Sequence, residues 1–179
     1  MGKLLDLAKA LAGEKSLHGL FGRWIQAVSS ALDAQGGATP LEYIQVGYTA
    51  PQTIAANTDL LPDDTIIVSG ITYSPPSGLF RLTGGKKYHL LAHGRFTDFS
   101  DDTGGVLNVA WLDNDSSGVL GVVGVFEPHT STVDACDHPV VEAVIAPTED
   151  VNVKLRCRSA TGSAIINAGG FSASIVELR

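Results

Sequence analysis

The chain has little of what marks a secreted, membrane-spanning or disulfide-stapled protein. It contains 2 cysteines in 179 residues, Cys136 and Cys157, too few for the disulfide framework of a small secreted domain. We expect both thiols to be reduced in a chain made in a cytoplasm. No run of about 18 apolar residues is present, so the sequence predicts no transmembrane helix and no membrane partner. The apolar stretch from Leu4 to Ala12 is broken by Asp6 and Lys9, so it does not resemble a signal peptide.

Charge is also scarce, and it is unevenly placed. Charged residues make up 17% of the chain, which suits a protein that buries surface against copies of itself or a partner. Residues 1–35 hold 4 basic and 3 acidic side chains, whereas the rest of the chain holds 8 basic and 16 acidic ones. An acidic body repels phosphates, so we expect no nucleic-acid partner.

Motifs for nucleophilic or cofactor chemistry are missing as well. The sequence has no Gly-x-Ser-x-Gly elbow, and the glycines between Gly118 and Gly124 have the wrong spacing for a dinucleotide-binding loop. Cys157 alternates with apolar residues, which indicates a buried and inert thiol. Paired acidic residues, such as those at 63–64 and 101–102, fall in turns, where they mark solvated hairpin ends. We therefore predict no enzymatic activity and no cofactor.

The possible metal ligands in the predicted strands and hairpins each have a simpler explanation. Residues 113–118, which read Asp-Asn-Asp-Ser-Ser-Gly, resemble the first half of a calcium loop. Gly124 occupies the twelfth position, where a calcium loop has a bidentate glutamate, so we predict a polar hairpin loop. His89 and His93 would lie on one face of a strand but about 13 Å apart, too far for one ion.

Two further polar clusters are predicted to be surface loops, and we expect no essential metal. One cluster matches no zinc-binding spacing; it consists of His129, Asp134, Cys136, Asp137 and His138. The other lies beside two glycines and predicts a solvated turn; it consists of Asp98, Asp101 and Asp102. The alternative for the second cluster is a cation site at a trimer apex or a receptor contact.

Helical periodicity is confined to the first 35 residues. Apolar residues recur at helical spacing from Leu4 to Ala12, and Ser16 can cap a second helix that the glycines at 36–37 end. The second helix carries a wide apolar stripe, which includes Leu17, Leu20, Phe21, Trp24, Ile25 and Val28. The stripe needs a surface to pack on, either the chain's own β-domain or, as we favour, sister chains or a larger assembly. We predict a helical anchor over residues 1–37 and a head domain over residues 38–179.

After a linker around residues 36–40 the apolar period changes to two, which is typical of strands. A series of eight or nine short strands without intervening helices indicates a mainly β fold, an antiparallel jelly-roll sandwich. The predicted strands are 43–49, 65–68, 79–82, 88–96, 106–112, 119–126, 140–146, 150–158 and 171–178. The strands at 119–126 and 140–146 are apolar on both faces, so the excess should line a threefold interface.

Two parts of the predicted head resemble a known family. The first part reads SGLFRL at 77–82 and GKKYHL at 85–90, and the closing strands read DVNVKL at 150–155 and GGFSASIVEL at 169–178. Together they resemble the jelly rolls of tumour-necrosis-factor-like proteins and of complement globular heads. The resemblance covers roughly residues 42–179 and implies the same jelly-roll fold.

A turn that reads LTGGKKY at 82–88 and a strand that reads VAWLD at 109–113 resemble virion proteins of tailed bacteriophages. In that group such jelly rolls occur as head-decoration or cement proteins, head fibres and tail-fibre knobs, typically as homotrimers fixed to the particle by an N-terminal segment. The resemblance implies a homotrimeric structural virion protein, made in the host cytoplasm and bound to the major capsid protein or another virion protein. The alternative is a receptor-binding knob that recognises a host-surface glycan or protein. The candidate loops at 98–105, 113–118 and 127–139 hold only Phe99 as an aromatic residue, which favours decoration.

Overall fold

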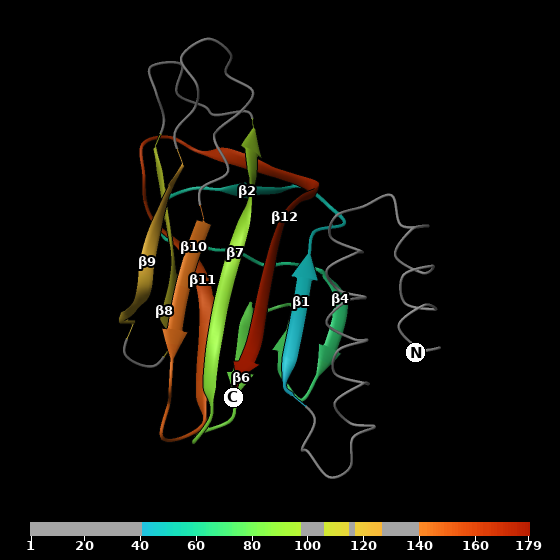
Figure 1. Cartoon of the computed structure of the whole chain (residues 1–179). Helices are drawn as coiled ribbons and strands as arrows, with labels where there is room; N and C mark the ends of the chain where they lie inside the picture. Colours follow the sequence, from blue (N-terminus) through green and yellow to red (C-terminus); the bar gives the residue numbers. More distant parts are fainter. Residues whose placement is uncertain (1–40, 98–105, 115–116, 127–139) are drawn as a thin grey trace, which may run out of the picture. The chain divides into compact units, whose positions relative to one another are not determined.

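A computed structural model of the chain describes residues 41–97, 106–114, 117–126 and 140–179. The chain divides into two compact units, Met1–Leu41 and Glu42–Arg179. All regular structure in the described residues is β-strand (Figure 1). No helix in these ranges is long and apolar enough to cross a membrane. The predicted helices lie outside the described residues, as do the predicted anchor residues Leu17, Leu20, Phe21, Trp24, Ile25 and Val28.

The described residues form twelve strands. They are β1 (Tyr43–Gly47), β2 (Gln52–Ile54), β3 (Thr58–Asp59), β4 (Asp64–Ser69), β5 (Thr72–Ser74), β6 (Leu79–Leu82), β7 (Lys87–Thr97), β8 (Leu107–Asp113), β9 (Val119–Phe126), β10 (Val140–Ile145), β11 (Val151–Ala160) and β12 (Ala164–Leu178).

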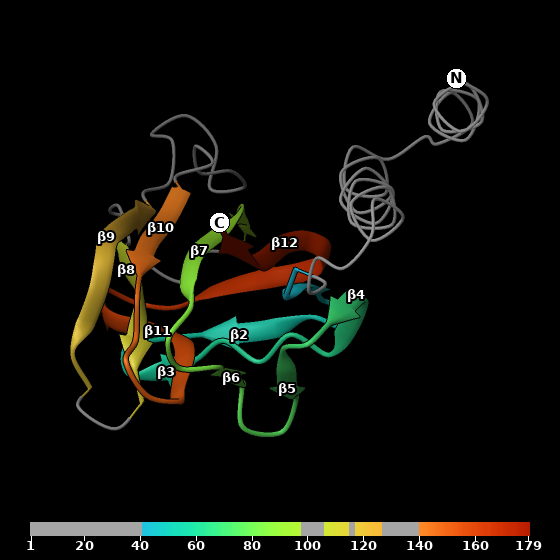
Figure 2. The same ribbon diagram turned by 60° about the horizontal axis from the view of Figure 1, so that its bottom comes forward.

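Most strands belong to one antiparallel path that folds back on itself to form two layers. The path runs β2-β12-β7-β10-β9-β8-β11-β6-β5, while β3 pairs with β11 and β1 pairs separately with β4. One layer contains β12, β7 and β10, and the other contains β8, β11 and β6 (Figure 2). β9 pairs with β10 on one side and with β8 on the other, so it joins the layers. Strands far apart in sequence, such as β12 and β7, are neighbours, which is the connectivity of a jelly roll.

Every second side chain of the long strands points inward, and these side chains fill the space between the layers. The inward row of β7 and the inward row of β11 are almost completely buried, and their apolar members are Tyr88, Leu90, Ala92, Phe96, Val153, Leu155 and Cys157. The residues between them point outward and are half-buried or exposed. The predicted inward position of Cys157 is therefore confirmed, because period-2 alternation puts every second side chain of a strand on the same face.

The nine predicted strands are all present, and the structure adds to them. Strands β2, β3 and β5 are two or three residues long, too short for an alternating pattern to be visible in the sequence. Strand β12 begins at Ala164, seven positions before the predicted start. Its register with β7 shifts between Ile166 and Phe171, and Gly169 in this stretch has a φ of 68°. The irregular stretch interrupts the alternation, so the sequence indicates only the second half of the strand.

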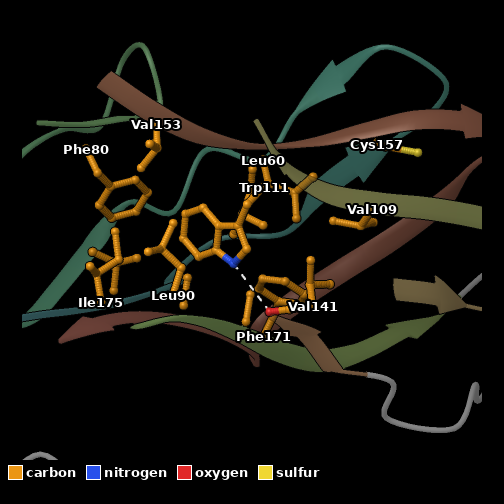
Figure 3. Packing of buried hydrophobic residues seen from close by; sticks show 14 of the residues in the cluster. Leu60, Phe80, Leu90, Val109, Trp111, Val141, Val153, Cys157, Phe171 and Ile175 are labelled. Atoms are coloured by element: carbon orange, nitrogen blue, oxygen red, sulfur yellow. Dashed lines mark hydrogen bonds between the residues drawn. The ribbon is translucent and has the colours of Figure 1, made fainter. Parts of the chain in front are cut away.

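Trp111 of β8 lies at the centre of the core (Figure 3). Its ring meets that of Phe80 edge to face, with centroids 5.6 Å apart. Its indole Nε1 donates a hydrogen bond of 3.3 Å to the main-chain oxygen of Val141, which belongs to β10 in the opposite layer. A buried tryptophan needs such a partner, because an unpaired buried N–H costs free energy. The indole therefore links the two layers by packing and by a hydrogen bond.

The contact between β9 and β10 is short. Only one residue pair, Val122 with Glu142, is in register between these strands. Gly121, which precedes Val122, has a φ of 70°, and a Cβ atom there would lie 2.1 Å from the main-chain oxygen of Glu142. Only glycine suits such a conformation and such a close approach. The sandwich therefore closes along this edge through a brief approach of two strands and the indole contact behind it.

We predict that Trp111→Phe lowers the free energy of unfolding by about 2–3 kcal/mol, because it removes volume from the core and leaves the Val141 oxygen without its donor. Urea unfolding at a fixed protein concentration measures the change. Tyr73→Phe is the control, since it removes a hydrogen bond to the Pro62 oxygen from a ring that is only partly buried. A loss below about 0.5 kcal/mol for Trp111→Phe would contradict a central role for the indole.

Candidate functional site

The outward sides of β9 and β10 carry a set of exposed valines. Their exposed fractions run from 37% to 63%, and we call the set the valine face: Val119, Val122, Val125, Val140 and Val144. On β10 the alternate residues Val141 and Ala143 are buried, so this strand is apolar on both sides. The prediction that both faces of these strands are apolar is confirmed. Exposed β-branched residues on neighbouring strands mark a candidate interaction surface.

The neighbouring strands extend this surface with half-buried residues. In the register of β7 with β10, His89 is opposite Val144 and Leu91 is opposite Glu142. In the register of β7 with β12, His89 is opposite Val176. The outward side of the β12-β7-β10-β9 layer is thus mostly apolar near the valine face, with His89 and Glu142 among apolar neighbours.

The side chains of His89 and Glu142 form a polar pair across β7 and β10, which is an ion pair when the imidazole is protonated. The His89 Nε2 atom lies 2.7 Å from a Glu142 carboxylate oxygen, and the side chains are 33% and 50% exposed. The residues are diagonal neighbours in the register, within reach of long side chains. An exposed pair of this kind contributes little to the stability of a single chain, about 0–1 kcal/mol. The position of the pair among apolar residues therefore says more about its role than its contribution to stability does.

The second histidine of β7 has a different partner. The imidazole of His93 lies 3.2 Å from the hydroxyl of Ser172 on β12. The prediction that His89 and His93 share one face is confirmed by the burial pattern of β7, in which both are half-buried and alternate with buried residues. Each imidazole therefore has a partner of its own, Glu142 for His89 and Ser172 for His93.

Glu42, the first residue of the head unit, is held by a polar cluster. Its carboxylate accepts hydrogen bonds from the Thr83 hydroxyl at 3.0 Å and the Tyr88 hydroxyl, and lies 2.8 Å from Lys86 Nζ. Its main-chain N–H donates to a carboxylate oxygen of Glu177 at 2.9 Å, and its carbonyl accepts from the Glu177 N–H at 2.8 Å. The Glu42 cluster therefore joins the start of the head to the β6–β7 turn and to the end of β12.

The cluster changes the pKa values of its members. Burial raises the pKa of Glu42, but the hydrogen bonds from Lys86, Tyr88 and Thr83, together with the charge of Lys86, outweigh burial and bring this pKa below 4.5. The hydrogen bond to Glu42 and the two nearby carboxylates raise the pKa of Lys86. Both shifts favour the charged forms, which identifies the cluster as a structural ion network.

The other predicted candidates lie wholly or partly outside the described residues. The Asp113 N–H donates to the Gly118 oxygen at 3.0 Å between antiparallel β8 and β9, whereas Asp115 and Ser116 of the predicted polar loop lie outside the described residues. In the described ranges, no group of three or more His, Cys, Asp or Glu residues could hold a metal ion. The candidates outside these ranges are Asp98, Asp101, Asp102, His129, Asp134, Cys136, Asp137 and His138.

Cys157 is buried and free, and it lies outside any reactive environment. Burial raises the pKa of its thiol, and Sγ approaches the main-chain oxygen of Ser159 at 3.4 Å. A raised pKa suppresses the thiolate, which is the reactive form of cysteine. The prediction of a buried thiol is therefore confirmed.

Sequence reasoning missed the partners in both polar groups. The residues of the Glu42 cluster are 46 positions apart for Glu42 and Tyr88 and 135 apart for Glu42 and Glu177, so no local pattern joins them. A signal for the ion pair exists in the sequence. Glu142 is the only charged residue in the apolar run 140–146, and a charge there indicates a partner on a neighbouring strand.

Comparison with known proteins supports the fold alone. No protein-family model matches the chain, and no curated protein matches it. Among solved structures, the Eiger TNF of S. frugiperda is similar with 11% identity and a TM-score of 0.58, over 79% of this chain and 94% of that one. Murine APRIL is similar with 13% identity and a TM-score of 0.50, over 77% of this chain and 99% of that one. The head therefore has the jelly-roll fold that its sequence predicts, and this fold is similar to that of tumour-necrosis-factor-like proteins.

We predict that Glu42→Gln lowers the free energy of unfolding at pH 7 by about 1–3 kcal/mol, because it removes the charge that Lys86 and Tyr88 face. The folded-state pKa of Glu42 is depressed, so its stabilisation is complete above 4.5 and is lost as the pH falls through the lower folded-state value. The difference between wild type and variant should therefore shrink from pH 7 to pH 3 in urea unfolding. The exposed Glu149→Gln is the control and should show no such difference at pH 7; equal effects of the two variants would contradict the prediction.

Proposed function

We propose that the chain is a structural virion protein, a homotrimeric head decoration, cement or head-fibre protein attached to a phage capsid by its N-terminal segment. The observation that carries the proposal is the valine face. The core between the layers is already filled, so five exposed valines on adjacent strands do not serve the folding of the head. Their exposure instead favours a surface that a partner covers.

A second copy of the same chain is the partner that the charges favour. The chain carries a net charge of −7, so two copies repel each other over most of their surfaces. The outward rows of β7 and β10 carry one carboxylate, Glu142 beside His89, together with the exposed cations Lys87 and Arg95, so this side lacks the acidic excess of the rest of the chain. Copies can therefore meet there with little repulsion. Three copies around one axis would cover every valine face, since a ring of identical contacts closes on itself.

A structural role is favoured over receptor recognition by the kind of residue that is exposed. The large hydrophobic residues exposed in the described part of the chain are one isoleucine and six valines, without a tryptophan, tyrosine or phenylalanine. Recognition surfaces are enriched in aromatic anchors, which carry much of their binding energy. A face of β-branched aliphatic residues suits permanent packing between subunits. We therefore infer that the protein acts mechanically, without catalysis, on the exterior of the virion after synthesis in the host cytoplasm.

The proposed attachment rests on the predicted helix at the N-terminus. Its stripe contains Trp24 among aliphatic residues, and a tryptophan at the centre of an interface is the commonest kind of energetic anchor. Residues 1–35 hold 4 basic and 3 acidic side chains, so this segment does not share the negative net charge of the head. The major capsid protein or another virion protein is the proposed partner of this segment.

For self-association, we expect the full-length chain to have the mass of a trimer in light scattering and Val144→Asp to have the mass of a monomer. The charge would have to lose water inside the proposed interface, which is costly. The matched control is Val68→Asp on β4, because Val68 is 50% exposed but lies outside the valine face. It should remain trimeric. A monomeric wild type, or dissociation of both variants alike, would contradict the proposal.

For attachment, we expect Trp24→Ala to weaken binding to capsids that lack the protein by at least about 2 kcal/mol, or roughly 30-fold. The measurement is the amount of protein that sediments with the capsids over a range of added protein concentrations. Gln26→Ala in the same predicted helix is the control and should bind like the wild type. If Trp24→Ala fills the capsids as completely as the wild type does at the same protein concentrations, attachment does not depend on this helix and the proposal is contradicted.

A further inference from the structure

We propose that the His89–Glu142 pair determines the orientation in which copies of the chain pack on one another. This inference rests on the proposed self-association through the valine face. An apolar face by itself specifies contact but not alignment, because the hydrophobic effect is non-directional and follows the area that is covered. A polar pair at a fixed point of such a face can supply the missing alignment.

The pair has the position that this role requires. In the strand registers, apolar residues stand opposite His89 on both sides and opposite Glu142 on both sides; they are Leu91, Val122, Val144 and Val176. His89 and Glu142 are 2.7 Å apart and are partly exposed. A second copy that covers the surrounding valines would therefore also cover the pair and remove water from it.

Loss of water makes the pair selective. In the free chain, solvent supplies the hydrogen bonds that the pair does not make internally, so the pair contributes little. Under a second copy, every donor or acceptor of the pair that is left without a partner pays the full cost of losing its water. An arrangement that gives these groups polar partners is then favoured over arrangements that place them against valine. The best-attested use of a buried polar group is to fix register in this way, at some expense in stability.

Among the charged residues of this surface, Glu142 is the one that best distinguishes one packing arrangement of two copies from another. The outward row of β7 contains Lys87, His89, His93 and Arg95, whereas the outward row of β10 contains Val140, Glu142 and Val144. On these two rows Glu142 is the single carboxylate. His93 is beside Ser172, and Arg95 lies further along the strand with interactions of its own. Sliding a second copy by one residue pair would change what faces Glu142 more than what faces any valine.

The test uses full-length protein and the double variant His89→Leu/Glu142→Leu, which makes the face wholly apolar. We expect wild type to give one trimeric species in native mass spectrometry and sedimentation velocity. The double variant should associate at least as tightly, but as a mixture of oligomers. Glu142→Gln keeps an acceptor for the imidazole, so it should remain a single species with about tenfold weaker association.

The matched control separates alignment from a general gain of apolar surface. Arg81 and Asp150 form an exposed pair of 3.0 Å on the other layer, with side chains 66% and 52% exposed. Arg81→Leu/Asp150→Leu should remain one trimeric species. If the His89/Glu142 double variant is also one trimeric species, or if the control gives the same mixture, the pair does not set alignment and the inference is overturned. A monomeric wild type would instead refute the proposed self-association itself.

Discussion

The jelly roll depends on how its two layers are joined along the edge formed by β9. That strand pairs along most of its length with β8, but with β10 at a single position. The indole of Trp111 adds a second link at this edge, because it packs in the core and donates to the Val141 oxygen of β10. Removing either the close approach at Gly121 or the indole would leave two sheets with an uncovered edge, and unpaired edges invite association with other chains. The division between inward and outward surfaces follows from this closure.

Because the core is complete inside that closure, the outward residues are free to serve assembly. Val141 and Ala143 face inward on β10, and Val140 and Val144 face outward on the same strand. The first set stabilises the fold of one chain, and the second set is available to a partner. A strand that is apolar on both sides usually belongs to the middle of a larger structure. This contrast on one short strand is the physical basis of the proposed trimer.

The fold could be predicted from the sequence wherever a strand is long enough to show its period. The alternation of Val153, Leu155 and Cys157 is visible in the printed sequence and corresponds to the inward side of β11. Strands of two or three residues form only where a longer strand offers a partner, as β11 does for β3 at Thr58–Asp59, so their own residues do not predict them. The candidate surface was predictable as an excess of valine. The lone charge of Glu142 in its apolar run indicates a partner but does not identify His89, because that contact depends on the register of two strands and joins residues 53 positions apart.

The Glu42 cluster has a consequence for engineering. It holds the beginning of the head against the end of β12, since the main chains of Glu42 and Glu177 are bonded to each other. Proteins whose ends are adjacent tolerate circular permutation and insertion into other chains. A short linker could therefore join Arg179 to residue 42, with new ends opened at the exposed Thr161–Gly162 turn between β11 and β12, which lies outside the Glu42 cluster and has a glycine at a φ of 82°. The head would then be a cassette that can be spliced into a loop of another protein and removed again without cutting through its sheets.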